Sequence, residues 1–392
     1  MSEYLVKKVL DKTFFRKPSS SLLGSLDMEL TERCNNNCIH CYINRPANDV
    51  AAHDRELSTF EIQKILEEAA GLGCPRVRFT GGEPLLRPDF ADIYIFARKL
   101  GLKVMLFTNA TLITEAMADL FCRIPPLEKI EVSVYGMMPE TYEAVTRIPG
   151  SFQAFERGVR LLQEKNIPFI VKGVLLPSSQ QDIAALDAWA ATIPWMDRPP
   201  SHNFFFTLCA RGNCSKSDVI KRIRIEPEEG VAALMHRSKK FFKDSKEFCS
   251  KFMKPYGDRL IVCAAGMGSG CVDAYGIFQP CMILRHPEVS YDLKNGSLKD
   301  ALENFFPAVR ERRVTNKDFL KRCAVCFLGG LCEQCPGKSW TEHGTLDTPV
   351  DYYCDIAHAQ ARSLGLIQEG ERAWEAKDGP ARVQRFLNNP NE

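Results

Sequence analysis

Long apolar runs are missing from this chain of 392 residues. No run of about eighteen apolar residues occurs, and no apolar segment of the signal-peptide type follows the N-terminus, so the sequence predicts neither a membrane span nor secretion. A surplus of one charge is missing as well, because 51 Lys and Arg residues balance 49 Asp and Glu residues and leave a net charge of +2. So small a net charge gives no reason to expect nucleic acid or a membrane as a partner. Because membrane-span and signal-peptide segments are missing as well, we expect a cytoplasmic protein.

Cysteine, by contrast, is abundant, with sixteen residues in the chain. The cytosol keeps thiols reduced, so these cysteines do not indicate a disulfide framework. Most of them gather in two stretches of the sequence, and such clustering is typical of metal ligands. We therefore expect most of them to bind metal.

The first stretch holds Cys34, Cys38 and Cys41, followed directly by Tyr42. Three thiolates within eight residues can bind three corners of one iron–sulfur cubane, which leaves one iron without a protein ligand. An open iron can bind a substrate or a cofactor directly. Two other interpretations stay open at this point, a zinc loop and three ordinary buried thiols, although zinc sites usually combine paired C-x2-C units or histidines at other spacings.

The spacing C-x3-C-x2-C with an aromatic residue after it resembles the signature of the radical S-adenosylmethionine (radical SAM) superfamily. The resemblance implies a 4Fe–4S cluster on these three cysteines, with Tyr42 beside the bound cofactor. In that family the open iron binds the amino and carboxylate groups of SAM. Reductive cleavage of the sulfonium then yields a 5′-deoxyadenosyl radical.

A repeating strand and helix pattern surrounds this loop. Polar and apolar residues alternate over 25–31, which predicts a strand that carries the cysteine loop at its C-terminal end. Further strands are expected at 76–80, 103–108, 129–134, 168–176 and 202–208. Helices are expected after a capping box of Ser58 and Glu61, from Asp89 onward, and at 114–122, 151–166 and 178–192. Six such alternations predict an α/β fold with a parallel sheet, and six strands in place of eight resemble the partial (β/α)6, TIM-like barrel of the radical SAM core.

The loop after the second strand resembles another family motif. Gly81, Gly82, Glu83 and Pro84 match the GGEP sequence that binds the amino group of the SAM methionine. Glycine permits a close backbone approach, and Glu83 or the carbonyl groups can receive an ammonium. The resemblance therefore assigns these four residues to the cofactor site.

Two polar residues at the ends of the next strands match positions where relatives contact the nucleoside. Asn109 follows the third strand, and Ser133 lies at the end of the fourth, where the hydroxyl commonly meets the ribose. Ala110 departs from the glycine that is common at its position. Asn and Ser at strand ends are also frequent as simple turn or cap residues, so both interpretations stay open.

The second cysteine-rich stretch begins at Cys263. Cys271 and Cys281 flank a predicted hairpin whose turn lies at 273–276. The whole pattern, C-x12-G-x4-C, gap, C-x2-C-x5-C-x2-C, gap, C, resembles the SPASM extension, which in related enzymes carries two auxiliary 4Fe–4S clusters. Cys332 and Cys335 depart from it, because two residues separate them where three are usual.

The resemblance implies two auxiliary ligand sets. For the first cluster the ligands would be Cys263, Cys281, Cys335 and, as the fourth, Cys271. The alternative for Cys271 is a buried thiol, with a substrate or another group on the fourth iron. For the second cluster the ligands would be Cys323, Cys326, Cys332 and Cys354. With the three cysteines of the SAM cluster, these sets use eleven thiolates.

Five cysteines remain outside the ligand sets: Cys74, Cys122, Cys209, Cys214 and Cys249. Cys209 and Cys214 follow the sixth strand and are our candidates for catalytic residues, as donors of a hydrogen atom to a carbon radical. A thiol without function is the commoner alternative.

We expect an arm at 1–24, a radical SAM core at 25–235, a helical bridge at 236–262, a SPASM domain at 263–358 and a helical tail at 359–392.

The predicted function is that of a radical SAM oxidoreductase or maturase, which abstracts a hydrogen atom from a peptide or protein side chain while the auxiliary clusters transfer electrons. An external donor such as flavodoxin or ferredoxin would reduce it. The arm is shorter than the fused leader-binding domain of many peptide-modifying relatives, so we expect a peptide to be recruited by a separate leader-binding protein or by direct contact, and deletion of residues 1–20 to leave peptide binding intact.

Three alternatives accompany this prediction. A radical SAM enzyme that acts on a small molecule, such as a tetrapyrrole or a quinone-cofactor precursor, would share every motif described above. A noncatalytic iron–sulfur scaffold or electron carrier would not need the loops that resemble the SAM site. A structural zinc protein would contain zinc and no iron.

Overall fold

The computed structural model describes residues 23–196, 203–210, 216–237 and 241–388, and the chain divides into two compact units. Met1–Phe205 and Ala264–Val309 form the first unit, and Phe206–Cys263 and Arg310–Glu392 form the second. Residues 264–309, which resemble part of the SPASM extension, thus belong to the same unit as the predicted barrel. The domain boundaries drawn from the sequence stay a prediction.

A nine-stranded sheet forms the centre of the first unit, in the order β11-β10-β9-β1-β4-β5-β6-β7-β8. Six neighbouring strands in it are parallel: β1 (Ser25–Thr31), β4 (Arg76–Gly81), β5 (Lys103–Thr108), β6 (Ile130–Val134), β7 (Phe169–Val174) and β8 (Asn203–Phe205). They are the six strands expected from the sequence, with ends that differ by a few residues. The predicted α/β class with a parallel core is therefore confirmed.

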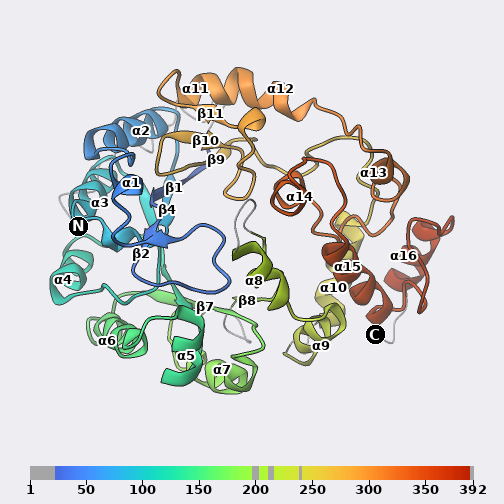
Figure 1. Ribbon diagram of the computed structural model, residues 1–392, viewed down its shortest axis with the longest axis horizontal. Helices are drawn as coiled ribbons and strands as arrows, with labels where there is room; N and C mark the ends of the chain where they lie inside the picture. The colour runs from blue at the N-terminus through green and yellow to red at the C-terminus, as the bar shows by residue number, and fades with distance from the viewer. Residues whose placement is uncertain (1–22, 197–202, 211–215, 238–240, 389–392) are drawn as a thin grey trace. The chain divides into compact units, whose positions relative to one another are not determined.

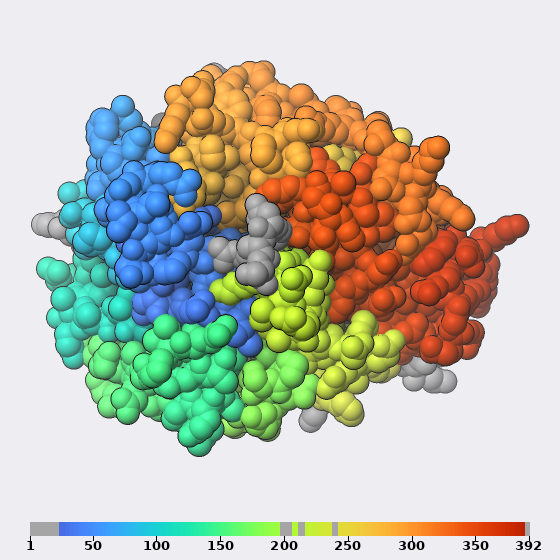
Figure 2. Space-filling model, viewed as in Figure 1, coloured from blue at the N-terminus to red at the C-terminus, as the bar shows by residue number. Residues whose placement is uncertain are grey.

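Helices follow these strands and cover one face of the sheet (Figure 1). They are α2 (Thr59–Gly71), α3 (Phe90–Lys99), α4 (Glu115–Arg123), α5 (Pro139–Thr146), α6 (Ser151–Glu164) and α7 (Ile183–Ala190). The predicted capping box is confirmed at α2, where the Ser58 side chain accepts from the Glu61 N–H and the Glu61 side chain from the Ser58 N–H. In the space-filling view, the segments of this unit coloured from blue to green lie directly against one another on the face shown (Figure 2).

The pleat of β1 explains which residues face the helices. Leu26, Met28 and Leu30 alternate along the strand and belong to the apolar core shared with the helices. Asp27, Glu29 and Thr31 therefore point to the opposite face. Strand β1 thus presents a polar inner face and an apolar outer face.

A hairpin extends the sheet beyond β1. Strand β9 (Ser269–Val272) runs parallel to β1, and β10 (Ile277–Gln279) pairs antiparallel with β9 and with β11 (Tyr291–Asp292). The hairpin itself is as predicted, whereas its pairing with β1 was not foreseen. Other short elements are β2 (Arg33–Cys34), β3 (Arg45–Pro46), α1 (Val50–His53), α11 (Leu298–Asp300) and α12 (Phe306–Arg310).

The second unit is helical. Its helices are α8 (Lys216–Arg222), α9 (Pro227–Arg237), α10 (Phe241–Phe252), α13 (Lys317–Lys321), α14 (Pro336–His343), α15 (Asp351–Ser363) and α16 (Gly379–Asn388). Leu328, Leu366 and Phe386 are among the residues of its apolar core. Within the described ranges, no helix of either unit is long and apolar enough to cross a membrane.

Candidate active site

The cysteine loop follows β1 and turns back to pair with itself through β2 and β3. Cys34 and Cys38 are buried, Cys41 is half-buried, and none of the three forms a disulfide. Burial raises the pKa of Cys34 well above its usual value, and the nearby charges of Glu83 and of the other two thiols raise it further. The spacing read from the sequence thus brings the three sulfurs close enough to act on one another.

Hydrogen-bond donors lie beside two of these sulfurs. The Asn36 N–H nitrogen lies 3.4 Å from Sγ of Cys34, the Asn44 N–H nitrogen lies 3.4 Å from Sγ of Cys41, and Nδ2 of Asn109 lies 3.8 Å from Sγ of Cys34. The Asn36 side chain is buried, and its Oδ1 and Nδ2 have no hydrogen-bond partner among the residues that the structure describes. Thiols with N–H donors and an orphaned amide beside them fit an iron–sulfur cluster with a cofactor on it.

Two glycines let the loop after β4 touch the base of the cysteine loop. A Cβ on Gly82 would lie 2.1 Å from the carbonyl oxygen of Arg33, and a Cβ on Gly81, whose φ is +134°, would lie 2.1 Å from that of Thr31. Backbone hydrogen bonds hold this contact, from the Gly82 N–H to Thr31 O at 2.7 Å and from the Glu83 N–H to Arg33 O at 2.9 Å. Both glycines are therefore required by a backbone contact.

Replacing Gly82 with alanine is expected to lower the free energy of unfolding by about 3 kcal/mol, because a backbone carbonyl cannot move aside for the new Cβ. Urea unfolding and the iron content after reconstitution measure the effect. Gly71→Ala is the matched control, since nothing lies within 4 Å of the Cβ that it adds. A Gly82→Ala protein as stable as the control would contradict the close packing of the two loops.

Glu83 joins the loops after β4 and β5 and is fully buried. Its carboxylate accepts hydrogen bonds from Oγ1 of Thr108 at 2.8 Å and from the N–H groups of Asn109 at 2.8 Å and Leu85 at 3.1 Å. Burial raises the pKa of Glu83 to about 7, and these hydrogen bonds oppose the rise. Pro84, also buried, begins the short helical turn Pro84–Leu86.

The loop after β5 begins with Asn109. Its amide donates to Oδ1 of Asn35 at 3.0 Å and accepts from the Thr111 N–H at 2.9 Å, so the side chain links this loop to the cysteine loop. Ala110 is buried with a φ of +60°, in the left-handed region that favours glycine. The family's glycine at this position thus has a backbone reason, and alanine accepts the conformation at a cost of about 1 kcal/mol.

Ser133 and Tyr42 are the remaining predicted cofactor residues. Ser133 is half-buried on β6, where its register partner is Lys172 of β7. The guanidinium of Arg285 lies 5.9 Å from the ring centre of Tyr42. Two residues beyond Ser133, burial raises the pKa of Tyr135 well above its usual value, and the nearby cysteine-loop thiols raise it further. The roles of Ser133 and Tyr42 toward SAM stay predictions.

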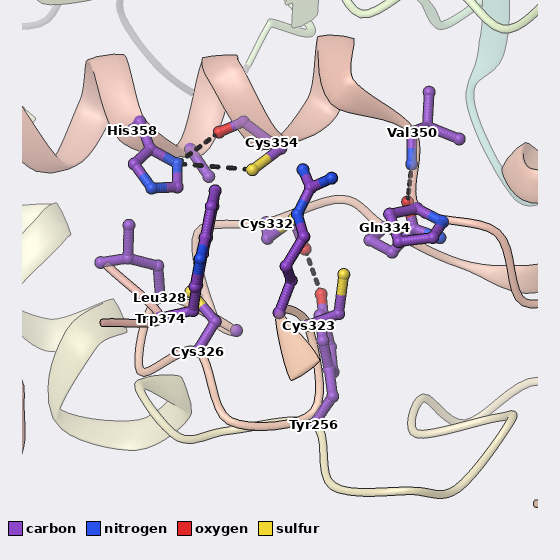
Figure 3. Close-up of a pocket in the computed structure, with 14 residues that line it drawn as sticks. Tyr256, Cys323, Cys326, Leu328, Cys332, Gln334, Val350, Cys354, His358 and Trp374 are labelled. Carbon is purple, nitrogen blue, oxygen red and sulfur yellow. Dashed lines mark hydrogen bonds between the residues drawn. The ribbon is translucent and has the colours of Figure 1, made fainter. Parts of the chain in front are cut away.

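A cavity in the second unit is lined by four further predicted ligands: Cys323, Cys326, Cys332 and Cys354 (Figure 3). Cys354 lies on α15, and the other three lie between α13 and α14. None forms a disulfide. Burial raises the pKa of Cys323 to about 12, and the charge of the Cys354 thiol adds to the rise. Four cysteines that lie up to 31 positions apart in the sequence thus line one cavity.

The donor set at this cavity suits a cubane. Among the described residues, no three His, Cys, Asp or Glu side chains are arranged to hold a single metal ion. A cubane separates its ligand sulfurs more widely, because each sulfur binds a different iron. Arg322 lines the same cavity, and its Nε is buried there without a hydrogen-bond partner in the described part of the chain, as expected of a donor beside an additional acceptor.

The ligands predicted for the other auxiliary cluster belong to both units. Cys271 and Cys281 are in the first unit, and Cys263 and Cys335 are in the second. Cys271 is fully buried on β9. Burial raises the pKa of its thiol well above the usual value, and the carboxylate of Glu29 adds to the rise. The ligand roles of these four cysteines stay predictions.

A model of the Radical SAM superfamily matches residues 28–190. This part of the chain is a radical SAM domain. It is 26% identical over 334 residues to an AdoMet-dependent heme synthase of Methanosarcina barkeri, across 81% of this chain and 92% of that protein. It is 33% identical over 157 residues to an Fe-coproporphyrin III synthase of the same organism, across 40% of this chain and 38% of that protein.

Solved structures share the fold of this chain. Streptococcus suis SuiB bound to S-adenosylmethionine matches with a TM-score of 0.62 and 16% identity, over 85% of this chain and 77% of that chain. The enzyme anSMEcpe, with bound AdoMet and the Cp18Cys peptide, matches with a TM-score of 0.58 and 15% identity, over 93% of this chain and 99% of that chain. The predicted likeness to SPASM-type radical SAM maturases is thus confirmed at the level of the fold.

Charged pairs on the inner face of the radical SAM sheet were missed by the sequence reasoning. Arg285 donates to the fully buried Glu29, and burial raises the pKa of Glu29 to about 7 although this ion pair opposes the rise. Arg78 lies 2.9 Å from Asp27. The signal was present in β1, since acidic residues alternating with apolar ones in a strand covered by helices must face the inside of the barrel.

The cysteines outside the ligand sets have ordinary surroundings where the structure describes them. Cys74 and Cys249 are buried, and Cys122 is exposed. Cys209 is half-buried, and burial raises the pKa of its thiol. Cys214 lies outside the described residues. The proposed hydrogen-donor role of Cys209 and Cys214 therefore stays a prediction.

Proposed function

We propose that the loop of Cys34, Cys38 and Cys41 holds a 4Fe–4S cluster with one open iron, and that SAM binds there. When bound, the cluster supplies the electron that cleaves the sulfonium of SAM and yields methionine and the 5′-deoxyadenosyl radical. The observation that carries this proposal is the gathering of three undisulfided thiols at the end of β1, with N–H donors directed at the sulfurs of Cys34 and Cys41. Active sites of barrels of this kind form at that end of the strands.

The surrounding residues would orient the cluster and SAM. The Asn109 amide, bound to Asn35 and near Cys34, would hold the cysteine loop against the loop after β5. Gly81 and Gly82 permit the close approach of the loop after β4. Because the carboxylate of Glu83 already accepts from three protein donors, we assign the SAM ammonium to backbone carbonyl groups of that loop.

For the cavity of the second unit we propose an auxiliary 4Fe–4S cluster on Cys323, Cys326, Cys332 and Cys354. The four thiols line one cavity, and the buried Nε of Arg322 beside them has no hydrogen-bond partner among the described residues. Four thiolates would close this cluster to substrate, so it would transfer electrons only. A second auxiliary cluster, on Cys263, Cys281, Cys335 and Cys271, rests on the resemblance to the SPASM pattern.

A peptide or protein side chain is the first candidate substrate. The fold is shared with SuiB, of which one structure contains the precursor peptide SuiA, with a TM-score of 0.57 and 16% identity. It is also shared with anSMEcpe bound to a peptide. At these identities the likeness concerns the architecture, so this candidate also depends on the sequence pattern of the SPASM extension.

A tetrapyrrole is the second candidate substrate, and a different observation favours it. The sequence likeness to the heme synthase of M. barkeri covers 81% of this chain and 92% of that protein, so it extends beyond the barrel. The Fe-coproporphyrin III synthase shares a shorter stretch. This likeness is of sequence and not of fold alone.

One experiment separates the two candidates. The reconstituted, reduced enzyme is incubated anaerobically with SAM and either iron coproporphyrin III or any short peptide encoded beside its gene. If a peptide is the substrate, we expect 5′-deoxyadenosine formation to rise with the peptide and the peptide to change mass. Stimulation by the porphyrin, with a loss of mass from the porphyrin, would instead support the second candidate and contradict the first.

A further inference from the structure

Helix α15 places a histidine against one of the proposed cluster ligands. Cys354 and His358 are four residues apart, so they share a face of the helix. Nδ1 of His358 lies 2.8 Å from the carbonyl oxygen of Cys354 and 3.6 Å from its Sγ (Figure 3). The imidazole is thus within hydrogen-bonding reach of the sulfur that would bind iron.

A backbone group fixes the position of the ring hydrogen of His358. The Ala373 N–H donates to Nε2 at 3.1 Å, so Nε2 must carry the lone pair. The hydrogen of the neutral ring then lies on Nδ1, the nitrogen that faces Cys354. Trp374 packs edge-on against the ring, with centroids 5.3 Å apart, and the imidazole is 2% exposed. His358 is therefore held as a donor toward Cys354, with its one N–H shared between the carbonyl oxygen and the more distant sulfur.

Arg322 approaches the same sulfur. Its guanidinium pairs with Asp351 at 2.7 Å and Asp318 at 3.1 Å, and it stacks 4.8 Å from the ring centre of Trp374. Burial raises the pKa of Cys354, and a hydrogen bond from Arg322 and its positive charge oppose that rise. Two side chains thus direct hydrogen-bond donors at Cys354, one of them charged.

The neighbouring ligands meet donors of another kind. Burial raises the pKa of Cys326 and of Cys332, and the backbone N–H groups of Leu328 and Gln334 oppose the rise. Backbone donors are present whatever the side chain, whereas those at Cys354 depend on the identity of Arg322 and His358. The two side chains are therefore a feature of this sequence that substitution can remove.

We propose that Arg322 and His358 are positioning residues that raise the reduction potential of the cluster at Cys323, Cys326, Cys332 and Cys354 through hydrogen bonds to the Cys354 sulfur. Hydrogen bonds and positive charge at a ligand sulfur stabilise the more negative, reduced form of a cluster, so the potential rises. A raised potential suits a cluster that accepts an electron from a substrate radical. This inference rests on the auxiliary cluster proposed above.

The test is a redox titration of the reconstituted full-length protein, followed by electron paramagnetic resonance. The Cys323/Cys326/Cys332/Cys354→Ala variant lacks the cluster and identifies its signal by difference. We expect Arg322→Met to change the ratio of oxidised to reduced cluster at a fixed potential at least tenfold, which is a lowering of 59 mV for one electron. Arg322→Lys, which keeps the charge, should restore part of the change, and the potential of the SAM cluster should not move.

His358 supplies an independent pair of variants. His358→Phe keeps a ring against Trp374 and removes the donor, so its potential should fall, whereas His358→Gln keeps an N–H donor and an acceptor for the Ala373 N–H and should stay near the parent. If Arg322→Met loses iron, this pair decides the question. Equal potentials in His358→Phe, His358→Gln and the parent, with iron intact, would overturn the inference. Unchanged iron in the quadruple cysteine variant would instead overturn the proposed cluster itself.

Discussion

Replacing Cys34, Cys38 and Cys41 together with alanine is expected to reduce the conversion of SAM to 5′-deoxyadenosine and methionine to background. The three thiols are the proposed ligands of the cluster whose open iron binds SAM, so without them SAM has no iron to bind at this loop. The measurement is chromatography of 5′-deoxyadenosine after anaerobic reconstitution and reduction of both proteins.

Cys122→Ala is the control for this variant, because Cys122 is exposed on α4 and lies outside every proposed ligand set. It should cleave SAM at the parent rate. A triple variant that cleaves SAM as fast as this control would show that the loop is not the SAM site.

Iron content is expected to fall in separate steps of about four atoms. Three cubanes require about twelve irons per chain, and either the Cys34/Cys38/Cys41→Ala variant or the Cys323/Cys326/Cys332/Cys354→Ala variant should retain about eight. The two ligand sets belong to different compact units, so loss of one cluster should leave the other in place. Colorimetric iron and sulfide determination on the reconstituted proteins measures the steps.

A fully loaded parent protein with only about four irons would contradict the auxiliary clusters and leave the SAM cluster untouched. About eight irons in the parent would contradict one of the two auxiliary sets, and the quadruple variant then identifies which set is absent. Zinc in place of iron would support the zinc alternative.

Local sequence patterns were sufficient for the parallel strands, the cap of α2 and the cysteine loop. Alternation over 25–31, the Ser58 and Glu61 pair, and three cysteines within eight residues each depend on neighbours in the chain, so their geometry follows from spacing. The grouping of Cys323 to Cys354 around one cavity came from the family resemblance, since nothing local relates Cys354 to the earlier cysteines.

Contacts between distant segments could not be read from the sequence. The pairing of β9 with β1 joins residues more than 200 positions apart, and the Arg285 to Glu29 ion pair exists only because of that pairing. The tautomer of His358 depends on the Ala373 N–H, fifteen residues away in another segment. The family's usual glycine at the position of Ala110 was noticed, but its reason, a positive φ, needed the backbone.

The central claim is that an open iron at Cys34, Cys38 and Cys41 binds SAM, and the electron paramagnetic resonance spectrum of the reduced protein tests it most directly. Adding SAM to the Cys323/Cys326/Cys332/Cys354→Ala variant should change the signal of the SAM cluster, because the amino and carboxylate groups enter the coordination of one iron. The same addition to the Cys34/Cys38/Cys41→Ala variant should change nothing. A loaded cluster on Cys34, Cys38 and Cys41 whose spectrum is identical with and without saturating SAM would contradict the claim.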